Sequence, residues 1–196
     1  MKYLHRPELR AWSSFDEGRD LDFNSVALIR EGGNVLVDPL PMCDHDLQQL
    51  GELGGAASIV VTNSDHVRAA AALAELFGAR LLGPRGERAT FSLRCDDWLG
   101  EGDCVVPELR VLELEGSKTD GELSLLFDGH TLITSDLVRA QRPGCLNLLP
   151  DEKLKDKGAA LRSVARLAEL PGLQAVLVGD GWHLFADCAQ ALARLG

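Results

Sequence analysis

Residues 59–66 read Ile-Val-Val-Thr-Asn-Ser-Asp-His, and with the segment from Val67 to Phe77 they decide the fold of this chain. The apolar start predicts a buried strand, and the second half predicts an amphipathic helix that ends at Gly78. The apolar face of this helix consists of Ala69, Ala70, Leu73, Leu76 and Phe77.

The junction between this strand and this helix is polar. Asn63 or Ser64 is expected to cap the helix, and Asp65 and His66 follow directly. A metal ion or a substrate can bind at such a place. An acidic residue is also favoured in a first helical turn by the helix dipole alone, so both interpretations stay open for this pair.

Length and composition indicate one globular domain over residues 1–196. The 196 residues are long enough for one substantial core, which the 45% of hydrophobic residues can fill. Five scattered cysteines without a C-x-x-C pair predict reduced thiols that serve in packing.

Charge and hydropathy exclude several classes of partner. The net charge of −10 repels phosphate backbones, so we expect no nucleic-acid partner. Residues 1–8 contain no apolar core of a signal peptide, and no later run is long enough to cross a bilayer. We therefore expect a soluble, cytoplasmic protein without membrane contact, with a homo-oligomer left open.

The first half of the chain should contain few strands. Residues 25–29 and 35–37 predict a β-hairpin that ends at Asp38-Pro39, and these are the only two strands expected before a first helix near Asp44. After the stretch 59–77, residues 80–84 predict another short strand, which completes a strand-helix-strand unit.

The second half should form an antiparallel sheet followed by helices. Strands are predicted at 104–106, 109–114, 123–127 and 131–134, with a polar loop from Arg139 to Gly144 after them. A helix at about 157–170, a buried strand at 175–178 and a last helix at about 186–195 follow.

Three of these strands end at an aspartate, namely Asp65, Asp136 and Asp180. The ends of neighbouring strands gather at one edge of a sheet, where ligands commonly bind. Carboxylates that lie close together need a cation between them, which a metal ion or a lysine can supply.

The order of these motifs resembles the metallo-β-lactamase superfamily over nearly the whole chain. The matching features are a hairpin ending in Asp38, Asp65-His66 opening a helix, a loop from Gly116 to Gly121, Thr134-Ser135-Asp136 after a strand, and Gly179-Asp180-Gly181 near the end. The resemblance implies the α/β (α+β) class and an αββα four-layer sandwich, with the active site along one sheet edge.

The superfamily's metal motif, H-x-H-x-D-H, is only half retained. Asp65 and His66 match its final D-H, whereas Val61 and Asn63 occupy its two earlier histidine positions, and the loop that usually carries a later histidine has none. The resemblance therefore implies either no metal or one divalent metal, Zn, Mn or Fe, on Asp65, His66, Asp136 and Asp180.

Four further residues are candidates for the same site. Lys118, in the loop that usually supplies a metal ligand, is either a solvated loop lysine or the group that balances Asp136, in which case it can also stabilise an oxyanion. His183 is a candidate base or surrogate ligand, unless it only packs the last helix. Arg139 and Arg142 are candidates for binding an anionic substrate.

Two functions follow as hypotheses. The first is a mononuclear hydrolase of a small ester, thioester or lactone, with Asp65, Lys118 and His183 as its catalytic residues. The second is a non-catalytic binding or interaction protein in which Lys118 replaces the lost metal site. Either function implies a small-molecule substrate or ligand.

Overall fold

The computed structural model describes all residues from Met1 to Gly196. Contacts within the chain divide it into two compact units. The N-terminal unit comprises Met1–Gly83 and Arg88–Trp98, and the C-terminal unit comprises Pro84–Glu87 and Leu99–Gly196. The single domain over residues 1–196 stays a prediction.

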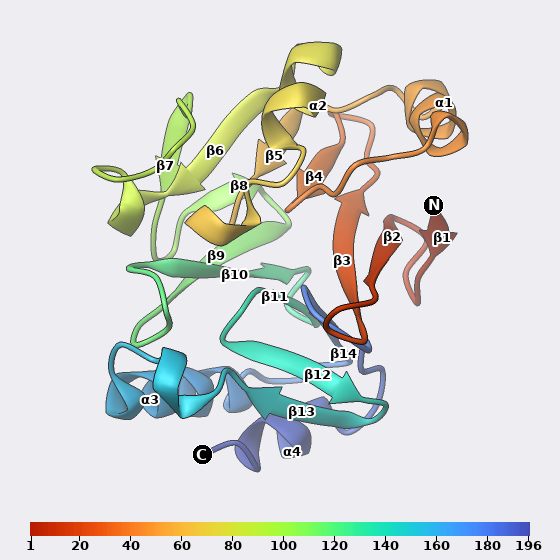
Figure 1. The fold of residues 1–196 in the computed structure, drawn as a ribbon. Helices are drawn as coiled ribbons and strands as arrows, with labels where there is room; N and C mark the ends of the chain where they lie inside the picture. The colour runs from red at the N-terminus through yellow and green to blue at the C-terminus, as the bar shows by residue number, and fades with distance from the viewer. The chain divides into compact units, whose positions relative to one another are not determined.

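The N-terminal unit contains a seven-stranded sheet whose strands follow one another in sequence order from β1 to β7 (Figure 1). The first four strands pair antiparallel, and β4, β5 and β6 pair parallel. The strands are β1 (Lys2–Tyr3), β2 (Leu9–Asp16), β3 (Leu21–Leu28), β4 (Val35–Val37), β5 (Ser58–Val60), β6 (Arg80–Pro84) and β7 (Asp97–Leu99).

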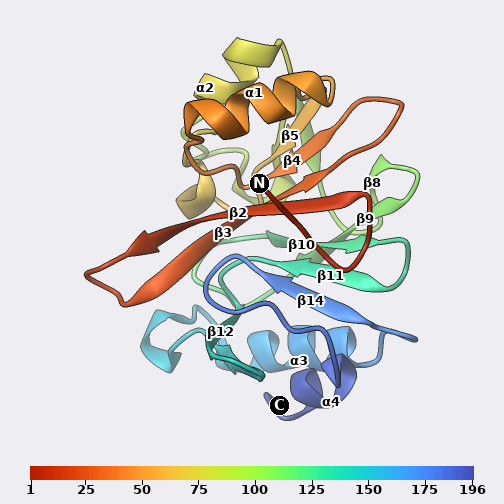
Figure 2. The same cartoon turned by 90° about the vertical axis from the view of Figure 1, so that its right-hand side faces the viewer.

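Two helices, α1 (Asp44–Glu52) and α2 (Ala70–Phe77), cover one face of this sheet (Figure 2). They connect the parallel strands, which cannot be joined by a tight turn. Leu50 of α1 and Leu73 of α2 are buried in one apolar cluster with Leu36 of β4 and Ile59 of β5. Two short 3-10 helices complete the assignments near this sheet, η1 (Ser64–His66) and η2 (Arg85–Glu87).

The C-terminal unit contains a five-stranded sheet in the order β14-β11-β10-β9-β8 and a separate two-stranded sheet of β12 and β13. Strands β8 to β11 pair antiparallel, whereas β11 and β14 pair parallel. The strands are β8 (Cys104–Val106), β9 (Leu109–Leu114), β10 (Glu122–Phe127), β11 (Thr131–Thr134), β12 (Val138–Arg142), β13 (Cys145–Leu148) and β14 (Ala175–Val178).

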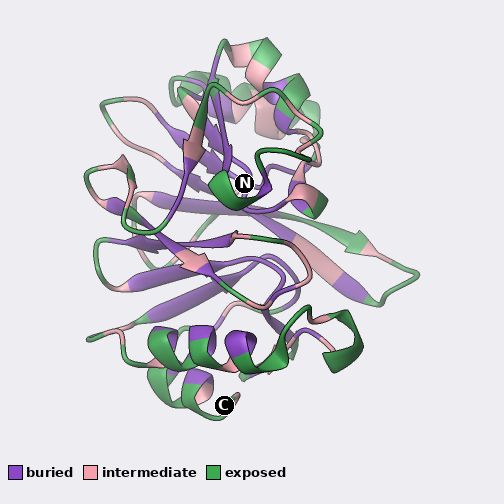
Figure 3. Ribbon diagram, turned by 90° about the vertical axis from the view of Figure 1, so that its left-hand side faces the viewer, coloured by how far each residue is buried: buried purple, intermediate pink, exposed green.

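Helices α3 (Lys157–Ala168) and α4 (Cys188–Ala193) pack against this sheet. The 3-10 turn η3 (Asp151–Lys153) precedes α3. Val164 and Leu167 of α3 and Leu192 of α4 are fully buried with Leu132 and Val176 of the sheet. Figure 3 shows that the strands of each unit are mostly buried, while the helices keep exposed outer faces. No helix combines the length and the apolar character that a membrane crossing needs.

The strand-helix stretch at 59–77 is confirmed, with one change. Gly78 ends α2 in the left-handed conformation (φ 65°), and the Asn63 side chain accepts a hydrogen bond from the backbone of the next turn, as a cap does. The α-helix begins only at Ala70, however. Residues 64–66 form a 3-10 turn, and Arg68 has a φ of 38°, which no right-handed helix allows.

Several sequence predictions are wrong. Cys43, Cys104 and Cys145, expected to serve in packing, are exposed. Four strands, not two, precede α1, and β2 was missed because its residues do not alternate between apolar and polar. The expected polar loop from Arg139 to Gly144 forms most of a hairpin of β12 and β13, in which Arg142 pairs with Cys145. Leu76, expected on the buried face of α2, is 60% exposed.

Candidate functional site

Two buried aspartates lie at one edge of the sheet in the C-terminal unit. Asp136 follows β11 and Asp180 follows β14, and these neighbouring strands run parallel with Thr134 opposite Val178. The parallel pairing therefore brings both strand ends together, as the sequence predicts. Asp136 is 2% exposed and Asp180 is 1% exposed.

Two basic side chains of the same unit pair with these aspartates. Lys118 Nζ lies 2.8 Å from Asp136 Oδ2. Arg139 Nη2 lies 3.5 Å from Asp136 Oδ1 and forms a close ion pair with Asp180 Oδ2. The four side chains thus form a charge-neutral quartet, in which the chain's own cations balance carboxylates that are buried at high cost when alone.

Arg139 has a different environment from the one expected for a loop residue. It lies in β12 and is only 7% exposed, and its Nε donor is buried without a hydrogen-bond partner. Its guanidinium is held by the two aspartates at the sheet edge, whereas Arg142, at the end of the same strand, is exposed.

The loop that carries Lys118 is anchored by a glutamate that the sequence analysis missed. Ser117 Oγ donates a short hydrogen bond to the Glu122 carboxylate, and both side chains are fully buried. Glu122 Oε1 also accepts a hydrogen bond of 2.8 Å from the backbone N–H of Leu137. This glutamate therefore connects the Lys118 loop to the segment that carries Asp136.

A second polar cluster lies in the N-terminal unit and is centred on Asp38. Asp38 Oδ1 accepts a hydrogen bond from the Thr62 backbone N–H (2.7 Å), and Oδ2 accepts from Thr62 Oγ1 (2.5 Å). The same Oδ2 lies 2.8 Å from His66 Nδ1, which must donate because an ionised carboxylate only accepts. This contact fixes the ring of His66, which is 4% exposed.

Arg68 completes this cluster. Its Nη1 donates to the backbone oxygens of Asn24 (2.6 Å) and Asp38 (3.0 Å), and its Nη2 lies 3.5 Å from His66 Nε2. Asp38 and Arg68 both have a positive φ, 46° and 38°, a conformation that is costly for a residue with a Cβ. Such strain persists only where surrounding contacts hold it, and here the hydrogen bonds do so.

The remaining predicted residues lie as follows. Asp65 is exposed in the first turn of η1, and its backbone N–H donates to Asn63 Oδ1 at 2.9 Å. His183 Nδ1 accepts a hydrogen bond of 3.2 Å from the Val178 backbone and packs edge-to-face against Phe185, with 6.2 Å between the ring centroids. A role of His183 as a base or surrogate ligand stays a prediction.

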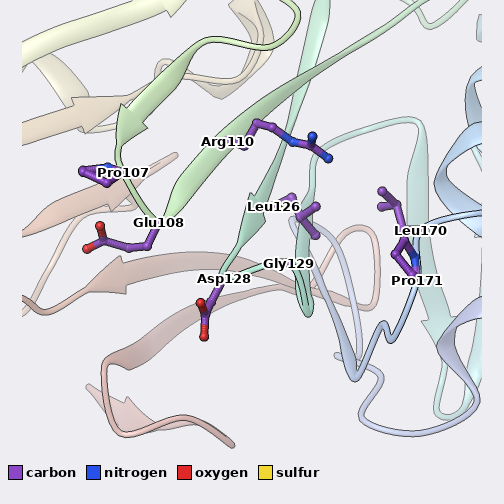
Figure 4. A pocket seen from close by; sticks show the side chains of 8 residues that line it. All are labelled: Pro107, Glu108, Arg110, Leu126, Asp128, Gly129, Leu170 and Pro171. Carbon is purple, nitrogen blue, oxygen red and sulfur yellow. The ribbon is translucent and has the colours of Figure 1, made fainter.

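One cavity of the C-terminal unit lies away from all of these residues. It has a volume of about 390 Å³ (Figure 4). The Asp128-Gly129 turn, which precedes β11, lines it, whereas Asp136 follows the other end of β11. Leu126 forms its centre, with Arg110 on one side and Leu170 and Pro171 on another. None of the residues predicted for the site lines it.

Comparison with known proteins identifies the family. The family model described as the metallo-β-lactamase superfamily matches residues 1–196, which is the whole chain. The chain belongs to the metallo-β-lactamase superfamily. No curated protein gives a significant match.

Several solved structures have the same fold. The DIM-1 metallo-β-lactamase superposes with a TM-score of 0.76 at 16% identity, covering 97% of this chain and 93% of that one. ETHE1 from Myxococcus xanthus gives 0.72 at 22% identity, with 95% and 84% covered. TTHA1623, solved in a di-iron-bound form, gives 0.70 at 21% identity, with 94% and 98% covered. The metallo-β-lactamase fold, an α/β sandwich with two mixed sheets, is thereby confirmed.

Three residues that the sequence analysis compares with the superfamily's ligand positions make other contacts. The Val61 side chain is apolar and fully buried in the core, and the Asn63 side chain serves as a helix cap. Ser117, which follows the glycine of the later histidine loop, is hydrogen-bonded to Glu122. Within either unit, no group of three or more His, Cys, Asp and Glu side chains is arranged to hold a metal ion.

Three of the four residues predicted to bind a metal ion contact other side chains. His66 Nδ1 is bound to Asp38, and the carboxylates of Asp136 and Asp180 face Lys118 and Arg139. Binding of one metal ion by Asp65, His66, Asp136 and Asp180 stays a prediction.

Sequence reasoning missed three residues of these clusters, Asp38 as a hydrogen-bonding centre, Arg68 and Glu122. The Asp38-Pro39 pair at the end of a strand could have indicated a side-chain role for Asp38, because an aspartate at a turn commonly forms hydrogen bonds through its carboxylate. For Arg68 there was no such signal, since an arginine after a histidine reads as the solvent face of a helix. Glu122 is an acidic residue within an apolar strand, and such a residue needs a buried partner.

Proposed function

We propose that this chain is a metal-independent, non-catalytic binding protein of the metallo-β-lactamase fold. In this proposal Lys118 and Arg139 neutralise the carboxylates of Asp136 and Asp180, in the place of the metal ions that the superfamily binds. The observation that carries the proposal is the 2.8 Å contact between Lys118 Nζ and Asp136 Oδ2. Asp136 is 2% exposed, and by its resemblance to the superfamily it matches the aspartate that bridges two metal ions there.

Charge balance supports this proposal. Two buried carboxylates require about two positive charges nearby if they are to stay ionised, and one lysine and one arginine supply them. A divalent ion bound to the same oxygens would have to displace both side chains. It would leave the guanidinium of Arg139 buried beside added positive charge.

The accessible part of the quartet is the place where a small-molecule ligand would bind. The Lys118 side chain is 25% exposed, whereas those of Asp136, Arg139 and Asp180 are 8% exposed or less. An ammonium group has three donors, so Lys118 can contact an acceptor on a ligand without leaving Asp136. Arg142 is exposed on the same strand as Arg139 and is a second candidate contact for an anionic group.

The test combines metal analysis with thermal unfolding of the intact chain. We expect substoichiometric metal in protein purified without chelator, and an unchanged melting temperature after addition of EDTA, because no resident ion contributes to stability. We expect Lys118→Ala to lower the stability by about 1–3 kcal/mol, since it leaves Asp136 short of a counter-charge.

Lys155→Ala is the matched control. Lys155 pairs with Asp120 at 2.7 Å in the same unit, but both side chains are at least half exposed (50% and 73%). Its loss should therefore change the stability by less than about 0.5 kcal/mol. A stoichiometric metal, or a melting temperature that drops with EDTA, would contradict the proposal, as would equal effects of the two lysine variants.

A second candidate function is a mononuclear metal-dependent hydrolase of a small ester, thioester or lactone. It is favoured by the oxygen and nitrogen donors kept at four family positions, Asp65, His66, Asp136 and Asp180. In this version Lys118 and His183 assist catalysis and Arg139 and Arg142 hold the substrate. Stoichiometric Zn, Mn or Fe that is lost in Asp65→Ala, together with hydrolysis that is lost in the same variant, would establish it against the first proposal.

A further inference from the structure

The outer edge of the sheet in the N-terminal unit is only partly covered. Strand β2 pairs with β3 along its whole length, from Leu9 opposite Leu28 to Asp16 opposite Leu21. On its other side, β1 pairs with Arg10 and Ala11 alone. Residues 12–16 of β2 therefore form an edge with no neighbouring strand.

The hydrogen-bond pattern shows which backbone groups face this edge. The oxygen of Glu8 accepts from Ile29 N–H toward β3, whereas the oxygen of Leu9 accepts from Leu4 N–H on the outer side. Backbone groups of successive residues alternate in direction along an antiparallel strand. The N–H and C=O groups of Ser13 and Phe15 therefore point outward, beyond the end of β1.

The part of β2 without an outer neighbour, residues 12–16, is called the open strip below. It carries none of the backbone features that usually prevent an edge strand from pairing. Natural edge strands are usually blocked by proline, an inward charge or a bulge, whereas residues 12–16 are Trp-Ser-Ser-Phe-Asp in unbroken register with β3. Ser13, Ser14 and Phe15 are exposed, Phe15 by 57%. Figure 2 shows β2 and β3 as a long hairpin that extends past the other strands of its sheet.

We propose that this strip pairs with the same strip of a second copy of the chain, antiparallel and centred on Ser14. The two-fold symmetry then places Ser13 opposite Phe15 of the second copy, and Phe15 opposite its Ser13. These are the residues whose backbone groups point outward, so the pair forms the ladder of hydrogen bonds that an antiparallel strand requires. This inference is independent of the proposed function.

Charge complementarity at the two ends of the strip favours a second copy as the partner. Lys2, opposite Ala11, is the residue of β1 that lies nearest to the uncovered part of β2, and it is exposed. In the antiparallel pairing centred on Ser14, Asp16 of the second copy lies opposite Trp12, end-on to Lys2, and Glu17 of the second copy begins the turn that leaves the strand there. Symmetry repeats this contact of opposite charges at the other end.

Sedimentation of the full chain tests the pairing. We expect a species of twice 21.2 kDa at millimolar protein concentration. Ser13→Pro should raise its dissociation constant by at least about tenfold, because proline removes an outward donor. The β2–β3 ladder keeps its hydrogen bonds, since the Ser13 N–H does not face β3, and proline is tolerated at such edge positions. Ser13→Ala is the matched control, because it removes the side-chain hydrogen bond to Asn24 but keeps the donor.

A charge exchange gives a second test that does not depend on proline. Lys2→Glu and Glu17→Lys should each weaken the dimer, and the double variant should restore it, because both symmetric contacts are re-formed with the charges reversed. A monomeric wild-type chain at millimolar concentration would overturn the proposal. So would a dimer that survives Ser13→Pro, or single charge variants that associate like the wild type.

Discussion

Asp38 combines a costly backbone conformation with three hydrogen bonds to its carboxylate. Its φ of 46° is costly for any residue with a Cβ, yet its carboxylate accepts bonds from Thr62 N–H, Thr62 Oγ1 and His66 Nδ1. The strain is therefore maintained by side-chain contacts. Without them, the chain has no reason to keep this conformation before Pro39.

Two substitutions at Asp38 separate these contributions. Asp38→Ala should lower the free energy of unfolding by about 3 kcal/mol or more. It leaves the buried donors of Thr62 and His66 without an acceptor, and residue 38 keeps its strained φ. Asp38→Gly loses the same hydrogen bonds but accepts a positive φ freely, so it should be less destabilising than Asp38→Ala by about 1 kcal/mol. Denaturant unfolding measures both; an alanine variant as stable as the glycine variant would show that the backbone strain is negligible.

The arrangement of the Lys118 loop depends on how closely it approaches helix α3. Gly116 has a φ of 81°, and a Cβ at this position would lie 2.2 Å from the backbone oxygen of Asp156 and 2.4 Å from the nitrogen of Ala160. The loop also accepts hydrogen bonds from the backbone N–H groups of Lys155 and Asp156. The start of α3 therefore positions the loop that carries the ammonium group at Asp136.

Gly116→Ala should accordingly cost much more than a matched glycine substitution. Gly129 has a φ of 72° and open space around its Cβ position, so Gly129→Ala measures the backbone strain alone, about 1–2 kcal/mol. Gly116→Ala adds a clash with helix backbone that only a shift of the loop relieves, so we expect at least about 2 kcal/mol more. Thermal unfolding of the two variants checks this, and equal losses would mean that the loop moves freely.

The elements that could be predicted from the sequence are those with a strong local pattern. Helix α2, the β3–β4 hairpin and the strands β9 to β11 combine clear periodicity with glycine or proline at their ends. The hairpin of β12 and β13 was taken for a loop because Arg139, Gln141 and Arg142 are polar. Its Pro143-Gly144 turn was a usable signal, but the register of β12 with β13 comes from tertiary packing that no local pattern encodes.

At the scale of the whole chain, the family and its fold were predicted from the order of five motifs, which include the aspartates at strand ends, the Asp65-His66 pair and the Gly116–Gly121 loop. The partners of the aspartates could not be predicted, because the choice among lysines and arginines depends on side-chain reach across elements distant in sequence. Arg139, for example, is separated from Asp180 by 41 positions. The absence of histidine at Val61 and Asn63 was visible in the sequence, whereas the occupation of the carboxylates by Lys118 and Arg139 required coordinates.

The five cysteines report on the folding of both units. Cys43, Cys104 and Cys145 are exposed, Cys95 is partly buried and Cys188 is buried. Burial, together with the neighbouring Asp96, raises the pKa of the Cys95 thiol to about 11. Burial also raises the pKa of Cys188, which is the first residue of α4 and packs in the core. Only the thiolate attacks a disulfide reagent, so both groups should be unreactive in the folded chain near pH 8.

We therefore expect an aromatic disulfide reagent at pH 8 to titrate the three exposed thiols rapidly in the native chain and all five after denaturation. Cys95 belongs to the N-terminal unit and Cys188 to the C-terminal unit, so Cys95→Ser and Cys188→Ser assign each slow phase to one unit. The folded state holds the thiol proton of Cys95 more tightly than the unfolded chain does, because the pKa of this thiol is higher in the folded state. This difference stabilises the folded chain fully below the unfolded pKa of about 8.5, and the stabilisation declines as the pH rises toward the folded pKa of about 11. The slow phase of Cys95 should thus accelerate over this range more than the reagent's reaction with free thiol does. Five rapid thiols in the native chain at pH 8 would contradict the burial of both groups.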